Sequence, residues 1–119
     1  MPKYLMLITE AESSYEGADE ANFARIMEMH NDFSKAVADA GATVLGGEAL
    51  QPTATATYLR NTRTHDVAVV DNPAPDLKEV LGGYYLIEAS DDAQAAELAK
   101  LCPAPYGYIE VRPIWEFSA

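Results

Sequence analysis

The chain has 119 residues, 49% of them hydrophobic, and its 19 acidic and 8 basic side chains give a formal net charge of −11. This length fits a single domain, residues 1–119, with a core of its own. The acidic balance argues against a nucleic-acid partner, because such binding depends on Lys and Arg contacts with phosphates. The chain has no apolar run near the ~20 residues of a membrane helix, no signal-peptide layout and a single cysteine. We therefore expect a cytoplasmic protein without a membrane partner.

The first third of the chain predicts a strand and then a long helix. Lys3–Thr9 is almost continuously apolar, as buried strands are. From about Asp19 to Ala40, apolar residues recur at spacings of three and four, the pattern of one buried helical face. These residues are Phe23, Ile26, Met27, Phe33, Val37 and Ala40. Gly41 suits the end of this helix, because glycine readily adopts the left-handed conformation found there.

His30 lies inside this apolar stripe, four residues after Ile26 and three before Phe33. A buried imidazole needs partners for its nitrogens, and its ordinary pKa of about 6.5 lets it transfer protons at neutral pH. His30 therefore has two interpretations. It is either a core histidine bonded to a nearby carbonyl group, or the proton-transferring group of a functional site.

The middle of the chain predicts a short strand and then a hairpin. Thr43–Leu45 is the short strand, and Thr53–Leu59 alternates with period two, which places three threonines on one face of a second strand. Asn61–Asp66 is typical of a hairpin turn, and Val67–Val70 of the strand that returns from it. Leu77–Leu81 is long enough for a single helical turn.

The last third predicts a strand, a helix and a final strand. Tyr84–Ala89 is the clearest strand of this region, and Ser90-Asp91-Asp92 can cap the helix that follows it. The apolar positions of that helix are Ala95, Leu98, Ala99 and Cys102. Pro103 ends it, and Tyr108–Val111 forms the last strand.

Without the hairpin, the element order is βαββαβ, which predicts an α+β fold with an antiparallel sheet and both helices on one face. The other face must then be polar, covered by a partner or occupied by a ligand. Along the last strand, one side carries aromatic and polar residues, and the threonines at positions 53, 55 and 57 are expected to face the same way. That side carries Tyr106, Tyr108, Glu110 and Arg112. Such a face favours a homodimer that encloses a wet pocket, and plain solvent exposure is the alternative.

No motif indicates a metal or a cofactor. The two histidines, His30 and His65, do not form a ligand pair such as HExxH. Gly46–Gly47 and Gly82–Gly83 lack the spacing that cradles phosphates, so a structural role is the better interpretation. We therefore expect no metal site and no cofactor.

Asp71 is the natural candidate partner for His30. It directly follows a predicted strand and precedes Pro73 and Pro75, in a loop position from which side chains often point into a site. A carboxylate that accepts from one imidazole nitrogen fixes the tautomer and makes the other nitrogen more basic. The alternative is an aspartate that bonds to its own turn.

Several segments, in the same order, resemble the YCII-related proteins and in particular their DGPF branch. They are Lys3–Ile8, His30 with Phe33, Gly46–Pro52, Leu81–Glu88, Cys102–Pro103 and Ile109–Pro113. Where that branch reads Asp-Gly-Pro-Phe-Ala-Glu-Thr-Lys-Glu, this chain reads Asp71-Asn72-Pro73-Ala74-Pro75-Asp76-Leu77-Lys78-Glu79. The motif is therefore degenerate. Its glycine is replaced by Asn72, a residue that tolerates positive φ better than most, and its phenylalanine is lost.

The resemblance implies a ferredoxin-like α+β domain that dimerises into a barrel-like assembly, similar to muconolactone isomerase. It also implies a His–Asp pair as the catalytic centre, which corresponds to His30 and Asp71. Some members of the family are encoded near extracytoplasmic-function sigma factors, and others are similar to small-molecule lyases or isomerases.

We therefore expect a cofactor-independent lyase or isomerase that acts on a small organic substrate. His30 would move a proton, Asp71 would orient it, and Glu48 and Arg112 would bind polar groups of the substrate. The alternative is a non-catalytic dimeric module that binds a ligand or a protein, with a link to sigma-factor regulation. An enclosed pocket with both His30 and Asp71 favours the enzyme. A His30 sealed by Phe33 and Met27 and bonded to backbone favours the module.

Overall fold

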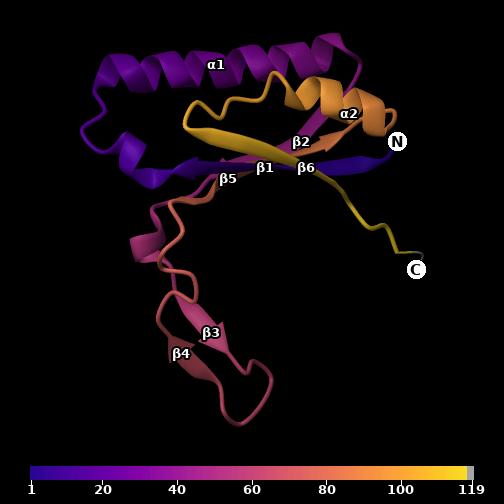
Figure 1. Cartoon of the computed structure of the whole chain (residues 1–119). Helices are drawn as coiled ribbons and strands as arrows, with labels where there is room; N and C mark the ends of the chain where they lie inside the picture. Colours follow the sequence, from indigo (N-terminus) through magenta and orange to yellow (C-terminus); the bar gives the residue numbers. More distant parts are fainter. Residues whose placement is uncertain (118–119) are drawn as a thin grey trace.

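A four-stranded antiparallel sheet with two helices on one face forms the body of the molecule in the computed structural model, which describes residues 1–117 (Figure 1). The strands lie in the order β2-β5-β1-β6. Their bounds are β1 Lys3–Ala11, β2 Thr43–Ala49, β5 Glu79–Glu88 and β6 Gly107–Pro113. The predicted mixed α+β architecture is confirmed, and this strand order is compatible with a ferredoxin-like fold.

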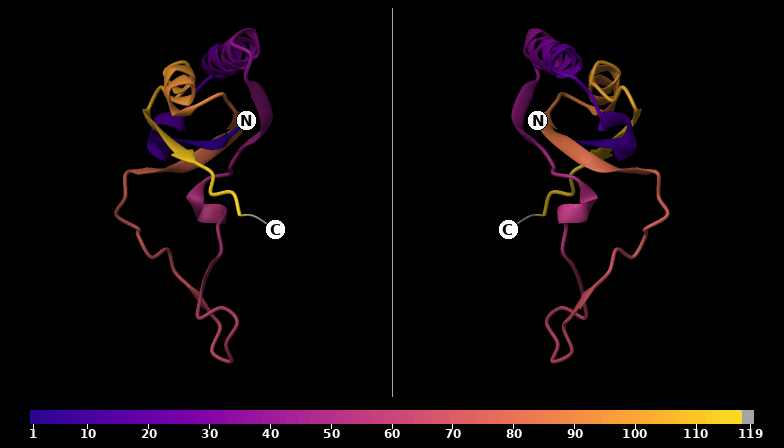
Figure 2. Two further views of the ribbon diagram at one scale, coloured as in Figure 1. Left: turned by 90° about the vertical axis from the view of Figure 1, so that its right-hand side faces the viewer. Right: turned by 90° about the vertical axis from the view of Figure 1, so that its left-hand side faces the viewer.

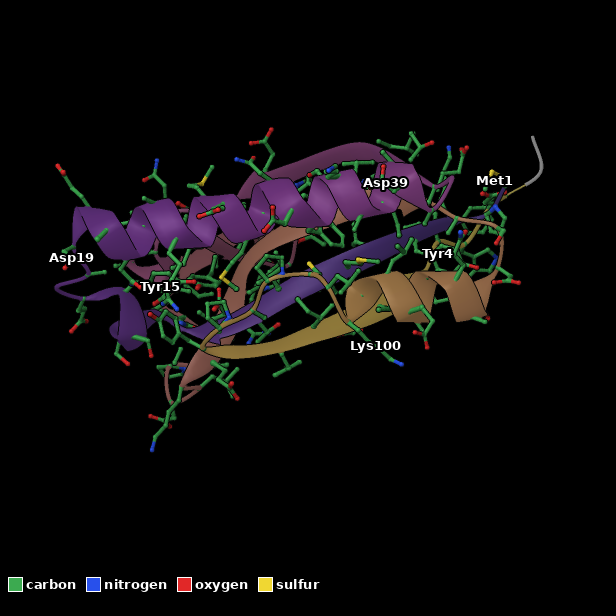
Figure 3. The ribbon with its side chains drawn as sticks, turned by 90° about the horizontal axis from the view of Figure 1, so that it is seen from above. Met1, Tyr4, Tyr15, Asp19, Asp39 and Lys100 are labelled. Atoms are coloured by element: carbon green, nitrogen blue, oxygen red, sulfur yellow. The ribbon has the colours of Figure 1, made fainter. Side chains whose placement is uncertain are left out.

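Each of the two helices begins directly after an aspartate whose side chain caps it. Helix α1 spans Glu20–Asp39, and the Asp19 carboxylate accepts the backbone N–H of Asn22 at 2.9 Å. Helix α2 spans Asp92–Ala99, and Asp91 caps it in the same way. Seen from above, both helices lie across the same face of the sheet (Figure 3). Neither helix, within residues 1–117, combines the length and the apolarity needed to cross a bilayer.

The core lies between the helices and the sheet. Alternate residues of β1, Tyr4, Met6 and Ile8, are buried there and meet Phe33 and Val37 of α1. The apolar stripe of α1 is narrower than predicted, because Phe23 and Met27 are exposed, Met27 by 59%. Each residue turns the helix by about 100°, so Met27 lies well to the side of the line through Ile26, Phe33 and Val37, whereas His30 lies at its border.

The opposite side of the sheet, here called the open face, is set by the register of the strands. Leu5 pairs with Leu86 and Arg112, and Leu7 pairs with Tyr84 and Glu110. Residues paired across strands project to the same side, so these side chains share the face without helices. Their apolar members are only partly buried. The open face is therefore mixed, with leucines at its centre and charged groups beside them.

Residues 50–78, here called the arm, leave the body on the open-face side and return to it (Figures 1 and 2). The arm contains a 3-10 turn, η2 (Thr53–Thr55), and a hairpin of β3 (Tyr58–Arg60) and β4 (Ala68–Val70). Because the arm projects away from the body, the molecule has an extended shape. The radius of gyration is 16.6 Å, against about 13.5 Å for a compact domain of this length.

Two predictions for this region are wrong. Thr53–Leu59 is not one strand, because the Glu12 carboxylate binds Thr53 and the Thr55 hydroxyl bonds to the carbonyl of Pro52, which holds a 3-10 turn instead. Leu77–Leu81 is not a helical turn, because β5 begins at Glu79 and pairs with the end of β1. The predicted hairpin turn is confirmed, with positive φ at Asn61 and Arg63.

Candidate functional site

The His30 imidazole and the Tyr85 hydroxyl form a short hydrogen bond, with Nδ1 and the phenolic oxygen 2.6 Å apart. His30 comes from the middle of α1 and Tyr85 from β5, on the face of the sheet beneath the helices. The ring of Phe33, one helical turn later, packs against Tyr85 with ring centres 4.8 Å apart. The pair is thus built from two elements and held in place by core packing.

Glycine makes room for the Tyr85 ring on the neighbouring strand. Gly47 of β2 pairs with Tyr85, and a β-carbon there would lie 2.7 Å from Cδ1 of the tyrosine and 2.8 Å from the carbonyl oxygen of Tyr84. No other residue fits without moving the ring or the strand. Gly47 therefore has the structural role expected for it. It leaves the space that the Tyr85 ring of the candidate site occupies.

Partial burial keeps the imidazole neutral. Desolvation lowers the pKa of His30 below its ordinary value, while the nearby carboxylate of Glu10 acts in the opposite direction. Burial also raises the pKa of Tyr85, so its hydroxyl stays protonated. Within residues 1–117, no buried side-chain nitrogen or oxygen lacks a hydrogen-bond partner, and the hydrogen bond of His30 is at Nδ1. Nε2 of His30 therefore reaches the surface.

This arrangement allows acid–base chemistry at Nε2. When Nδ1 carries the proton and donates to the Tyr85 oxygen, Nε2 has a free lone pair and can act as a base. When the Tyr85 hydroxyl donates to Nδ1, Nε2 carries the proton and can act as an acid. The bond at Nδ1 is to a side chain, so the arrangement expected for a sealed core histidine, with Met27 covering it and backbone bonds, is not the one observed.

A buried carboxylate, that of Glu10, lies near enough to His30 to act on its pKa. Glu10 of β1 is 8% exposed and accepts the Tyr15 hydroxyl at 2.6 Å and the backbone N–H of Tyr106 at 2.9 Å. Asn22 of α1 donates to the Tyr106 hydroxyl at 3.2 Å. Figure 3 shows Tyr15 beside the start of α1. These bonds tie the N-terminal end of α1 to the sheet, and they place Tyr106 on the helix side instead of the expected open face.

The other sequence-predicted site residues lie away from His30 in the same chain. Asp71 is exposed on the arm directly after β4, on the opposite side of the sheet from α1 (Figure 1). Glu48 pairs with Tyr84, and Arg112 pairs with Leu5, so both lie on the open face. Arg112 forms an ion pair with Glu110 there. Glu48 and Arg112 therefore share one face of the sheet, on its two opposite edge strands, and His30 lies with Tyr85 on the other face.

The loop after Asp71 bends differently from the expectation drawn from its motif. Asn72 does not have a positive φ, so it does not replace the motif glycine in that way. Its side-chain oxygen instead accepts the backbone N–H of Ala74 at 2.8 Å, the bond of an Asx turn. Asn72, and not Asp71, therefore shapes this turn.

The arm and the open face border an open hollow of about 600 Å³. Thr9, Leu81 and Tyr108 line it from the sheet. From the arm and its two ends it is lined by Leu50, Gln51, Thr53, Thr55, Ala56, Tyr58, Asn72, Ala74, Leu77, Glu79 and Val80. The predicted strand face of three threonines does not form, but Thr53 and Thr55 line the same hollow as Tyr108.

Two residues of the candidate site, Tyr85 and Glu10, are missing from the sequence-based prediction. Glu10 could have been recognised in the sequence, because it is a charged residue at the next inward-facing position after Tyr4, Met6 and Ile8. Tyr85 is harder to recognise, since its neighbour Tyr84 has the same chemistry and faces the other way.

The protein belongs to the YCII-related family, because the model of the YCII-related domain matches residues 2–118, almost the whole chain and the arm with it. No curated protein matches the chain. The resemblance drawn from the sequence is thereby confirmed at the level of the family.

Proposed function

We propose that this protein is a cofactor-independent lyase or isomerase that acts on a small organic substrate and works as a homodimer. The observation that carries the proposal is the 2.6 Å hydrogen bond between His30 and Tyr85, which orients a neutral imidazole whose Nε2 reaches the surface. In this proposal, His30 takes a proton from a carbon atom of the substrate and returns it elsewhere or to the leaving group. Tyr85 holds the imidazole in place at Nδ1 and accepts from its N–H when Nε2 acts as the base.

Asp71 enters the proposal as a residue of a second copy, because in its own chain the sheet lies between it and His30. The arm of a second copy would approach His30 past the edge strand β2, next to which Tyr85 lies on β5. The arm that carries it projects from the open face, toward the space that a second copy occupies in a face-to-face dimer. The matches at Asp71, Pro73, Lys78 and Glu79 support assignment to the DGPF branch.

Glu48 and Arg112 are proposed ligands for polar groups on the open face. One substrate molecule cannot contact them and His30 of the same chain, since they lie on opposite sides of the sheet. They therefore act at the inner surface of the dimer, where charged and apolar side chains lie together.

The alternative, a non-catalytic module that binds a ligand or a protein, is favoured by one observation. The arm exposes Leu59, Val67 and Val69, the last by 75%, so its hairpin offers an apolar surface with no cover from its own chain.

Hydrogen exchange in deuterium oxide tests the proposal against this alternative. Small carbonyl compounds with acidic C–H bonds are incubated with the protein, and deuterium uptake is followed by proton NMR. We expect uptake with the wild type, loss of it in His30→Ala, and a fall of ~10²-fold or more in Tyr85→Phe. Tyr84→Phe is the matched control, because Tyr84 projects to the open face. Equal uptake in the wild type and His30→Ala, or no uptake with any compound, contradicts the enzyme.

A further inference from the structure

The segment after β6 exposes two large aromatic side chains. Trp115 and Phe117 are each 81% exposed, and their rings stack with centres 5.6 Å apart and planes 8° apart. Aromatic residues bury roughly 150–250 Å² each where they pack, so leaving two of them in water forgoes a large apolar contact. An exposed pair of this size marks a surface that another molecule covers.

The hollow under the arm has the complementary chemistry. Leu50, Leu77 and Leu81 give it apolar walls, and each of these leucines is largely exposed. Tyr58 and Tyr108 supply further ring surface, and threonine hydroxyl groups line the same space. An indole needs this combination, because its body is apolar while its N–H requires an acceptor. The volume of about 600 Å³ has room for both rings.

The two features cannot meet within one chain. Ile114 donates its backbone N–H to the carbonyl of Lys3 at the start of β1, whereas Thr9 and Tyr108 line the hollow near the other end of the sheet. Lys3 and Thr9 are six residues apart on a strand, which is about 20 Å at roughly 3.3 Å per residue. The segment from Ile114 to Phe117 spans only about 10 Å when extended, and it runs down from the sheet instead of back along it (Figures 1 and 2).

The segment after β6 and the arm that borders the hollow both leave the sheet on the open-face side, at opposite ends of the strands (Figure 1). A two-fold axis that runs across the strands, between two open faces, therefore brings the tail of each copy to the hollow of the other. We propose that Trp115 and Phe117 of each copy occupy the hollow beneath the arm of the second copy. This inference rests on the homodimer of the proposed function and adds to it the residues that join the copies.

The area involved suits a stable dimer. Two aromatic side chains from each copy supply on the order of 600–1,000 Å², and the walls that cover them lose a similar area. The total lies within the roughly 1,200–2,000 Å² buried by ordinary specific interfaces. Contact between the leucines of the open faces, Leu5, Leu7 and Leu86, adds to it.

Trp115 makes the inference testable, because it is the single tryptophan of the chain. Fluorescence emission and acrylamide quenching are measured over a dilution series, with sedimentation equilibrium on the same samples. We expect short-wavelength, protected emission in the dimer, and a shift to longer wavelength with several-fold stronger quenching on dissociation. Leu77→Arg, in the wall of the hollow, is expected to expose Trp115 at concentrations where the wild type is protected. Leu101→Arg is the matched control, since Leu101 is exposed just beyond α2 and outside the hollow.

The outcomes separate this inference from the proposal on which it rests. A monomer at every concentration overturns both the homodimer and the tail exchange. A dimer with fully exposed Trp115, unchanged by Leu77→Arg, overturns the tail exchange alone. Protected Trp115 in a monomer places the tail on its own chain and also overturns the exchange. Binding of the dye anilinonaphthalene sulfonate to the dimer, abolished by Leu77→Arg while Trp115 stays exposed, assigns the hollow to a ligand instead.

Discussion

Thr53 donates both its backbone N–H and its side-chain hydroxyl to the carboxylate of Glu12, over 2.6 and 2.8 Å. Glu12 belongs to η1 (Glu12–Tyr15), the 3-10 turn that directly follows β1, whereas Thr53 begins η2 in the arm. A single carboxylate therefore fastens the outgoing side of the arm to the body. Since Thr53 also lines the hollow, the same contact holds one wall of that cavity in place.

Glu12→Ala is expected to loosen the arm while leaving the sheet intact. It removes two charge-assisted hydrogen bonds and leaves the Thr53 N–H without its partner, at a cost of about 1–3 kcal/mol in the free energy of unfolding. Hydrogen exchange of the backbone amides should accelerate at Thr55 and Ala56, whose bonds close η2. Glu16→Ala, an exposed neighbour, serves as the control. Unchanged exchange at η2 in Glu12→Ala would show that the arm is held by other contacts.

The stability of the protein is expected to fall as pH drops below about 6.5, in part because of His30. Desolvation lowers the pKa of His30 in the folded state, so between that lowered pKa and about 6.5 the unfolded chain binds the proton more readily. Stability is therefore fully retained above about pH 6.5 and declines toward the folded-state pKa. Urea unfolding of the wild type and His30→Asn at about pH 7.5 and about pH 5.5 measures the difference.

The part of the pH dependence of the unfolding free energy that disappears in His30→Asn is the contribution of this imidazole. His65→Gln is the control for the second histidine, which lies exposed in the hairpin turn. If His30→Asn and the wild type lose the same stability between the two pH values, the imidazole is not desolvated in the folded protein.

Cys102 is expected to be unreactive in the folded protein. Burial, with a smaller contribution from the Glu10 charge, raises the pKa of its thiol to about 12, so almost no thiolate exists at about pH 8. Ellman's reagent should modify the native protein slowly and the urea-unfolded protein at once. Because the chain has a single cysteine, the signal has one source. Rapid modification of the native protein would mean that the contact between α2 and β6 opens readily.

The elements of the body could be predicted because local chemistry and burial agree there. The capping segment Ser90-Asp91-Asp92, the periodicity of α1 and the apolar run of β1 each indicate the structure that packing later fixes. The arm was harder to predict. The alternation from Thr53 to Leu59 has the period of a strand, but a distant carboxylate, Glu12, determines its conformation.

The candidate site was only partly predictable for a related reason. His30 stands out because a polar residue interrupts an apolar stripe, and this pattern can be recognised from the sequence of α1 alone. Its partner depends on the register between two strands, which decides that Tyr85 and not Tyr84 faces α1. No pattern within one segment contains that information. The proposed pairing of His30 with Asp71 depends further on how two copies meet, and it stays a prediction.

The missing side chain of Gly47 gives a way to sort related sequences. A β-carbon at this position would occupy the space of the Tyr85 ring, so a larger residue there and an aromatic residue at position 85 are incompatible in this geometry. Relatives that carry both the glycine and the tyrosine can form the hydrogen bond to the helix histidine. A relative with a bulky residue at that place on β2 must use another group, even where its histidine is retained. A residue that takes no part in proton transfer therefore becomes the marker by which members with this pair can be recognised.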